Sequence, residues 1–425
     1  MTNPTESRST PALPAWKVLL FTSVLLGVFA VILEVSAHFY LKATRGYDGE
    51  HLLQYAFDPY KNIVPTPNFV DTRGIQHNSM GFRRSAEISR EKAPGTYRVF
   101  LMGASTAYGL GGLWTHIQDE FAVIPNDQTI DAYLEKSLQA RFPDRKIEVI
   151  NAAITSTWTH HNLIYLNQQV LSYDPDMILF LDGFNDFYWF DPSHNQFASY
   201  AYGEQSARIM GEPTFGALVF QNFWWLYRKS AFVHVMTREA RKLGGLFSRP
   251  TRSPIDVDKD LANLQSVFAR GPMTMIGRYV RMTSDAGVIP VEIHQPLLIM
   301  ERGRKSLTGI EQQLFEYNVN SYRPNYEAMM QRAVPWVNDT LAKVVTRAGG
   351  HYIDATRIYG ESQGQIFTDY CHLTPKGNEL LAAYIEQRIT PLIAADTIGA
   401  NRAVTASATT SARASVPASG AVRQR

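Results

Sequence analysis

The chain has 425 residues, of which 45% are hydrophobic and 19% are charged. A chain of this length and apolar content can bury a large core. Its 41 basic and 39 acidic residues leave a formal net charge of +2, so the charge gives no reason to expect nucleic acid as a partner. Its single cysteine cannot form an internal disulfide, and the cysteine content therefore does not distinguish an oxidising from a reducing compartment.

The first predicted element is a 20-residue apolar stretch from Val18 to Ala37. About 20 apolar residues are enough to cross the hydrocarbon core of a bilayer. Trp16 before the stretch and Tyr40 after it suit the two membrane interfaces. We therefore predict a single-pass signal-anchor helix over residues 16–38, after a disordered polar tail over residues 1–15.

A cleaved secretory signal peptide is the alternative for this stretch, because Val35-Ser36-Ala37 resembles a small-residue cleavage site. The apolar core is long for a signal peptide, and Glu34 stands where a helix end would meet headgroups. Basic residues are balanced on the two sides, so the positive-inside rule does not fix the orientation. A short tail before a large domain is typical of a signal anchor, which predicts an extracytoplasmic domain, periplasmic in a bacterium.

The domain that follows is predicted from alternating strands and helices. Residues 39–96 form a proline-containing juxtamembrane segment, residues 97–395 form the domain, and residues 396–425 form a disordered tail rich in Ala, Ser and Thr. Short apolar runs predict the strands Arg98–Met102, Lys146–Asn151, Met177–Asp182, Ile289–His294 and His351–Asp354. Helices are predicted over 129–141 and 159–172 and after Pro375. This alternation predicts an α/β fold, a flavodoxin-like three-layer α/β/α sandwich with a five-stranded parallel sheet in the order 2-1-3-4-5.

Three side chains suit nucleophilic catalysis. Ser105 follows the first predicted strand, and Asp369 and His372 stand three residues apart just before the last predicted helix. A serine hydroxyl needs an imidazole to take its proton, and the imidazole needs a carboxylate to fix its tautomer. A further polar side chain, Asn185, follows the third strand and can donate to a developing oxyanion.

Taken together, these blocks resemble the SGNH hydrolases, also called GDSL esterases and lipases. Gly103-Ala104-Ser105-Thr106, Gly183-Phe184-Asn185-Asp186 and Asp369-Tyr370-Cys371-His372 match in order and context, as do Asn78 to Arg83 and Gln295-Pro296. The resemblance covers roughly residues 78–389. Each block alone is common in turns and helix caps, and it is their order that is specific.

The resemblance implies a catalytic role for each residue of these blocks. Ser105 would be the nucleophile, His372 the base and Asp369 its orienting acid, while the Ser105 N–H and Asn185 would hold the oxyanion. Two positions depart from the family pattern: Ala104 replaces an acidic residue, and Ser156 stands where a glycine usually supplies a third oxyanion N–H. A serine keeps that N–H but restricts the backbone if φ must be positive.

Two insertions interrupt the domain, at residues 111–127 and 187–272; the first contains Trp114 and Phe121, and the second is rich in aromatic residues. They could wall a substrate cleft, lie against the membrane surface, or pack as ordinary helices on the core. His116, His160, His161 and His294 lack a tight ligand spacing, and a serine site needs no metal, so we predict no metal and no cofactor.

These features predict a membrane-anchored serine esterase that works through an acyl-enzyme. The predicted substrate is an O-acyl ester, with acetyl as the first choice, on an envelope or extracellular glycan. Two alternatives stay open. The same site could transfer the acyl group to a polysaccharide hydroxyl, as an O-acyltransferase, or the domain could be a non-catalytic glycan-binding or scaffold module. The acyl chain, the leaving group, protein partners and the oligomeric state do not follow from the sequence.

Overall fold

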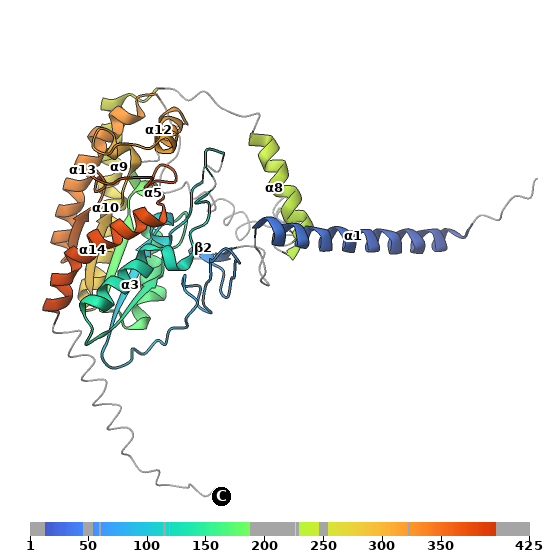
Figure 1. Cartoon of the computed structure of the whole chain (residues 1–425), viewed down its shortest axis with the longest axis horizontal. Helices are drawn as coiled ribbons and strands as arrows, with labels where there is room; N and C mark the ends of the chain where they lie inside the picture. Colours follow the sequence, from blue (N-terminus) through green and yellow to red (C-terminus); the bar gives the residue numbers. More distant parts are fainter. Residues whose placement is uncertain are drawn as a thin grey trace, which may run out of the picture. The chain divides into compact units, whose positions relative to one another are not determined.

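The structure is a computed structural model of the whole chain (Figure 1). It describes residues 13–45, 54–58, 61–113, 116–118, 120–187, 226, 229–245, 254–321 and 324–396. Two compact units divide the chain: residues 1–48 with 214–249, and residues 49–213 with 250–425. The aromatic run at residues 188–190 lies outside the described residues. The two predicted tails also lie outside them, except for residues 13–15 at the start of the described chain and residue 396 after α14.

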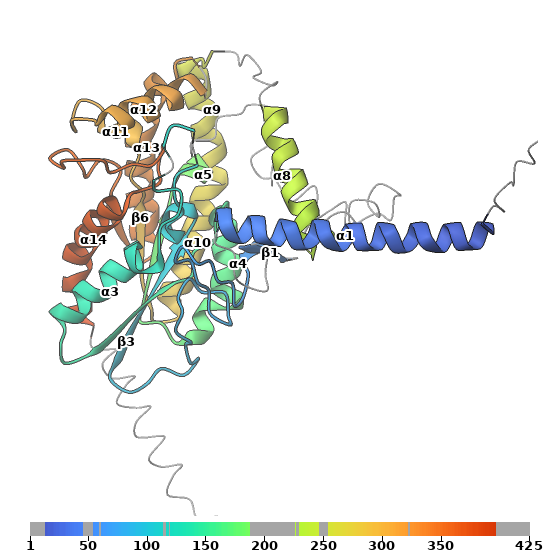
Figure 2. The same cartoon turned by 45° about the vertical axis from the view of Figure 1, so that its right-hand side comes forward.

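The second unit is built on a parallel sheet of five strands in the order β4-β3-β5-β6-β7. Figure 2 labels β3 and β6 of this sheet. These strands are β3 (Thr96–Gly103), β4 (Lys146–Asn151), β5 (Met177–Asp182), β6 (Ile289–His294) and β7 (His351–Asp354). Numbered along the chain within this sheet, the order is 2-1-3-4-5. The flavodoxin-like prediction is therefore confirmed, and four of the five strands have the predicted bounds.

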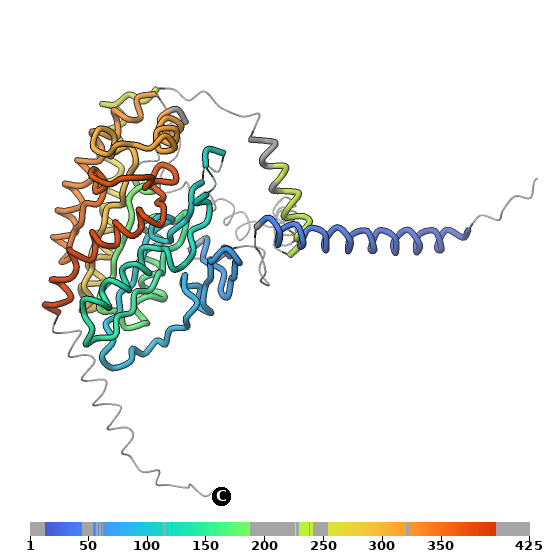
Figure 3. Tube along the Cα trace, in the orientation of Figure 1, coloured from blue at the N-terminus to red at the C-terminus, as the bar shows by residue number. Residues whose placement is uncertain are grey.

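Helices cover both faces of the sheet. On one face α3 (Ile130–Arg141) packs against α14 (Pro375–Ala395), as the tube of Figure 3 also shows. On the other face α4 (Thr159–Gln168), α10 (Pro272–Asp285) and α13 (Tyr326–Arg347) pack in succession, and α9 (Val257–Arg270) packs against α10 and α13. Further elements of this unit are α11 (Leu298–Glu301), α12 (Gly309–Ser321) and the 3-10 turns η1 (Asn126–Gln128) and η2 (Val170–Tyr173).

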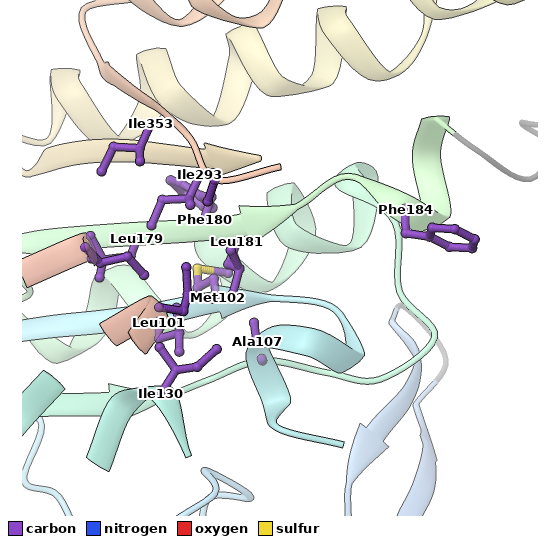
Figure 4. Close-up of a cluster of buried hydrophobic side chains, with 14 of the residues drawn as sticks. Leu101, Met102, Ala107, Ile130, Leu179, Phe180, Leu181, Phe184, Ile293 and Ile353 are labelled. Atoms are coloured by element: carbon purple, nitrogen blue, oxygen red, sulfur yellow. The ribbon is translucent and has the colours of Figure 1, made fainter. Parts of the chain in front are cut away.

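The core lies between the sheet and these helix layers. All eight residues of β3 and all six of β5 are buried, as expected for central parallel strands covered on both faces. Figure 4 shows part of this core, where Leu101, Leu179, Ile293 and Ile353 come from four neighbouring strands. Burial of each such side chain contributes about 1.5–3 kcal/mol to the stability of the fold relative to exposure. This packing holds the strands, and with them the strand ends where the candidate site lies, in place.

The part of the juxtamembrane segment that the structure describes packs on this domain. It contains a hairpin of β1 (Tyr55–Asp58) and β2 (Asn62–Pro65). Further along, Lys92 Nζ lies 2.5 Å from Asp176 Oδ1, directly before β5, and His77 Nε2 lies 2.6 Å from the hydroxyl of Tyr108. Residues 54–96 are therefore part of the folded unit that carries the sheet.

The first unit contains the long apolar helix α1 (Ala15–Arg45) and α8 (Ala231–Gly245), which contact each other. Residues Ala15–Thr44 of α1 are long and apolar enough to cross a membrane, with a mean hydropathy of 2.6 and none of the most apolar window buried. A signal sequence would pass the same test, so this helix is an anchor or a signal peptide by composition. It is longer at both ends than the predicted span of residues 16–38.

Candidate active site

The three family-like blocks lie at the carboxyl edge of the sheet. Ser105 begins α2 (Ser105–Tyr108) after β3, and Asn185 lies in α5 (Phe184–Phe187) after β5. β3 and β5 are hydrogen-bonded neighbours, with Gly103 paired to Leu181, so both side chains come from the same edge. Sites of open parallel sheets form at this edge.

Two positions of the family-like blocks require glycine, because neighbouring atoms lie too close for a side chain. Gly103 has φ of +139°, and a Cβ there would lie 2.1 Å from the carbonyl oxygen of Leu181. Gly183 has φ of +142°, and a Cβ there would lie 2.5 Å from Cδ2 of His294. Only glycine tolerates this backbone and this spacing, so both glycines of the motifs have a physical role in forming the two turns.

Asp369 and His372 form a buried pair. His372 Nδ1 lies 2.6 Å from Asp369 Oδ2, and the two side chains are 1% and 0% exposed. The Asp369 carboxylate also accepts the backbone N–H groups of Cys371 at 3.0 Å, His372 at 2.9 Å and Leu113 at 3.0 Å. Burial alone would raise the pKa of Asp369, but the charge and hydrogen bond of His372 and the backbone N–H groups of Cys371 and His372 lower it below the usual 3.8. The carboxylate is therefore charged at neutral pH.

The second ring nitrogen of His372 is the atom that a serine nucleophile needs. His372 Nε2 is buried and has no hydrogen-bond partner among the described residues. The turn of Ser105 reaches the same loop, because Thr106 Oγ1 lies 3.4 Å from the carbonyl oxygen of Cys371. Thr106 follows Ser105 and Cys371 precedes His372, so the residues next to Ser105 and His372 in sequence contact each other. A bond between nucleophile and base is often long before substrate binds.

Asn185 and Ser156 lie at the candidate oxyanion site. Asn185 Nδ2 donates one hydrogen bond to the carbonyl oxygen of Thr157 at 2.9 Å. An asparagine amide has two donors, so the second N–H is available to a ligand. Ser156, beside Thr157, is exposed and has φ of +59°. It therefore adopts the left-handed backbone conformation that favours the glycine of the family pattern.

We expect Ser156→Gly to stabilise the protein. A non-glycine residue in the left-handed region costs about 1–2 kcal/mol, and the greater flexibility of glycine in the unfolded chain offsets about 0.5–1 kcal/mol of this. A net gain of about 0.5–1 kcal/mol in the free energy of unfolding should follow, with the N–H of residue 156 kept in place. Urea unfolding of the wild type and the variant measures it, and a destabilised variant would contradict the strained backbone.

Gln295 connects the three blocks, although from the sequence it is only a position that matches the family pattern. Its side chain is buried after β6, where Nε2 donates to Thr106 Oγ1 at 3.0 Å and Oε1 accepts from the N–H of Phe184 at 3.3 Å. Thr106 in turn contacts Cys371. Gln295 therefore links the neighbours of Ser105, Asn185 and His372 in one network.

We expect Gln295→Met to lower kcat for ester hydrolysis about 10- to 100-fold with little change in KM, because a displacement of about 1 Å at the reacting groups costs up to about 100-fold. The variant keeps the side-chain length but leaves the Phe184 N–H without its acceptor. Steady-state kinetics measures the effect, and Gln295→Glu, which keeps the acceptor, should lose less. An equal rise in KM at constant kcat would contradict a positioning role.

The block from Asn78 to Arg83 supports the nucleophile turn. Arg83 is buried, and its Nη1 donates to the carbonyl oxygen of Gly109 at 2.7 Å and to that of Tyr108 at 2.5 Å, at the end of α2. Its guanidinium carbon lies 4.4 Å from the centre of the Tyr108 ring. A cation is favourable at the carbonyl end of a helix, so Arg83 closes the turn that begins at Ser105.

Three buried carboxyl groups lie in and next to the strands beneath the site. Burial raises the pKa of Asp182 and that of Glu292 well above their usual values, and raises the pKa of Asp186 to about 7. Asn162 donates to Asp182 at 2.5 Å, and the Tyr279 hydroxyl donates to Glu292 at 2.6 Å. Burial thus reduces the negative charge that Asp182 and Glu292 carry near neutral pH.

The four histidines considered for a metal do not gather in one place. His116 packs on Tyr317, His160 and His161 stack on each other, and His294 hydrogen-bonds Asn338. The group with ligand-like spacing among the described residues is Asp369, Cys371 and His372. Within this group Asp369 Oδ2 is already bonded to His372 Nδ1 at 2.6 Å, and the carboxylate also accepts the backbone N–H groups of Leu113, Cys371 and His372. This group fits a catalytic pair better than a metal site.

Comparison with known proteins gives structural matches only. No protein-family model matches the chain, and no curated protein matches it. Among solved structures it is similar to the acetylxylan esterase Axe2 from Geobacillus stearothermophilus (11% identity, 70% of this chain and 95% of that chain, TM-score 0.34), to the acetyl xylan esterase AlAXEase (12%, 69% and 99%, TM-score 0.33) and to a lipase/acylhydrolase from Enterococcus faecalis (15%, 69% and 95%, TM-score 0.32). Because these scores are below 0.5, the fold assignment rests on the strand order of this chain.

Proposed function

We propose that the chain is a membrane-anchored serine esterase of the SGNH type, with Ser105, His372 and Asp369 as its catalytic triad. The observation that carries this proposal is the buried pair of Asp369 and His372 next to the Ser105 turn. The Nε2 atom of His372 is buried and has no hydrogen-bond partner among the described residues. A buried ring nitrogen without a hydrogen bond costs free energy in a purely structural histidine. It is what a general base requires.

The chemistry follows from these positions. Ser105 Oγ attacks the acyl carbon while His372 Nε2 takes its proton, and the imidazolium that forms is stabilised by the charged Asp369. His372 then returns the proton to the leaving alcohol, which leaves an acyl-enzyme. Water attacks the acyl-enzyme, again with His372 as base, and releases the acid and free Ser105. The Ser105 N–H, the first in α2 and without an intrahelical acceptor, donates to the oxyanion with Asn185 Nδ2 and the Ser156 N–H.

The substrate that we propose is a small O-acyl ester, with acetyl first, on an envelope or extracellular glycan. This part rests on the family resemblance and on an extracytoplasmic location of the domain, which both the signal-anchor and the signal-peptide interpretation give. An anchored enzyme meets polymers near the membrane more often than dispersed lipid.

A fluorophosphonate probe tests the proposal, because it reacts covalently with an activated serine. The full chain in detergent micelles is incubated with the probe, and the labelled peptide is identified by mass spectrometry, alongside p-nitrophenyl acetate hydrolysis. We expect the label on Ser105, its loss in Ser105→Ala and its retention in Ser156→Ala, which removes a nearby exposed hydroxyl. Unlabelled Ser105 without turnover would contradict the esterase and favour a binding module. Labelling with turnover only after addition of a sugar acceptor would replace hydrolysis by acyl transfer.

A further inference from the structure

Glu34 is an ionisable residue within the apolar stretch of α1, and it has defined partners. Its carboxylate accepts hydrogen bonds from Ser230 Oγ at 2.6 Å, from the N–H of Ala231 at 2.5 Å and from the N–H of Phe232 at 3.2 Å. A charged side chain in a membrane-spanning segment costs several kcal/mol unless it is paired or reaches the interface. The hydrogen-bonding capacity of this carboxylate is taken up by another segment of the chain.

The partners of Glu34 are the first residues of α8. The first N–H groups of a helix lack intrahelical acceptors and carry the positive end of the helix dipole, so a carboxylate there is favourable. Capping usually comes from the residue before the helix. Ser230, in that position, donates to Glu34 and accepts from the N–H of Val233 at 3.2 Å. Glu34 therefore completes the cap of α8, although it lies almost 200 positions before that helix in sequence.

The two helices share a face beyond this cap. Ala37 and Leu41 are 7% and 1% exposed, whereas Phe39 between them is 70% exposed. With Glu34 they follow a spacing of three and four residues, which places them on one side of α1. Among the α8 residues whose side chains the structure describes, Ala231 and His234 are buried, and they stand three residues apart. The capped end of α8 thus belongs to a packed helix pair with the last turns of α1.

From these contacts we infer that α8 is an interfacial helix, which Glu34 holds at the surface of the lipid bilayer. The inference rests on the proposed anchoring of α1 and goes beyond the esterase activity. Glu34 lies near the end of the apolar stretch, so the capped end of α8 lies at the same depth as the headgroups. Met236 on α8 is 55% exposed, an apolar side chain that lipid can cover. The sequence of α8 contains three basic residues, a composition that suits anionic headgroups.

This pairing also separates the two interpretations of α1. Cleavage after Val35-Ser36-Ala37 would remove Glu34 and leave the start of α8 without its acceptor. Since α8 in the mature chain uses Glu34 of α1 as an acceptor, we expect α1 to be retained, and the pairing favours the signal anchor. The insertion that follows Asn185 in sequence would then be attached to the bilayer through α8.

The experiment uses the full chain in vesicles of phosphatidylcholine and phosphatidylglycerol, with a nitroxide label at Met236→Cys. Collision with oxygen, which is enriched in lipid, is compared with collision with a water-soluble nickel complex. We expect the label to be protected from nickel, whereas a label at Asp258→Cys, on an exposed position of α9, should stay accessible. The native Cys371 is buried, and the unsubstituted chain shows its background labelling.

Adding Glu34→Ala should move the Met236→Cys label into water, whereas Ser36→Ala on the exposed side of α1 should leave it in the interface. A label at position 236 as accessible to nickel as that at 258, or a mature chain that begins at His38, would overturn the inference. None of these measurements depends on ester turnover, so a failure of the esterase proposal would be seen separately.

Discussion

Replacing Asp369 by Asn is expected to lower kcat for p-nitrophenyl acetate about ten-thousandfold, the loss that this substitution gives in serine hydrolases of known mechanism. Asp369 Oδ2 accepts the hydrogen of His372 Nδ1, which leaves Nε2 as the basic nitrogen. An asparagine can present an N–H there instead, and this favours the other tautomer, whose Nε2 carries a hydrogen and cannot take the proton of Ser105. Pre-steady-state and steady-state kinetics at pH 7–8 measure the loss.

The same variant has a pH signature in its stability. The pKa of Asp369 is lowered in the folded protein, so its contribution to the free energy of unfolding is complete above the unfolded value near 3.8 and is lost as pH falls through the lowered pKa. The difference in stability between wild type and Asp369→Asn should thus be smaller in strong acid than at neutral pH. A kcat within tenfold of wild type, in a variant that unfolds like the wild type, would contradict the triad.

The sheet was predictable because its signals are local. Each strand is a short apolar run bounded by polar or turn residues, and central parallel strands are buried on both faces, so the runs β4 to β7 begin and end where hydropathy changes. The strand order follows from alternation with helices and from the family resemblance. By contrast, α12 and α13 fall in a region where polar and apolar residues are mixed and no strand or helix was predicted.

The site was predictable only in part, for the same reason. Asp369 and His372 are three residues apart, so their pairing can be expected from the sequence alone. The bonds of Gln295 to Thr106 and Phe184 join segments more than 100 residues apart, and no local pattern encodes them. The link between Glu34 and α8 is of the same long-range kind. A polar residue that is buried directly after a strand is the signal that could have identified Gln295.

Replacing Asn185 by Ala is expected to lower kcat about 100- to 1000-fold with little change in KM, because an oxyanion donor acts in the transition state and not on the bound ester. Asn185 Nδ2 is held by its bond to the carbonyl oxygen of Thr157, so its remaining N–H has a fixed direction. Asn185→Asp should lose more than the alanine variant, since a carboxylate would repel the developing negative charge.

Asn167→Ala provides the matched control for Asn185, because Asn167 is an exposed asparagine of α4 away from the strand ends. Its kinetics should equal those of the wild type. Fluorophosphonate labelling of Ser105 should slow in Asn185→Ala in proportion to kcat, because the probe forms the same kind of oxyanion. If kcat falls but labelling does not, Asn185 acts after acylation and the oxyanion would be held by the Ser105 and Ser156 N–H groups alone. If neither changes, Asn185 serves only to bind Thr157, and the site lacks the side-chain donor proposed here.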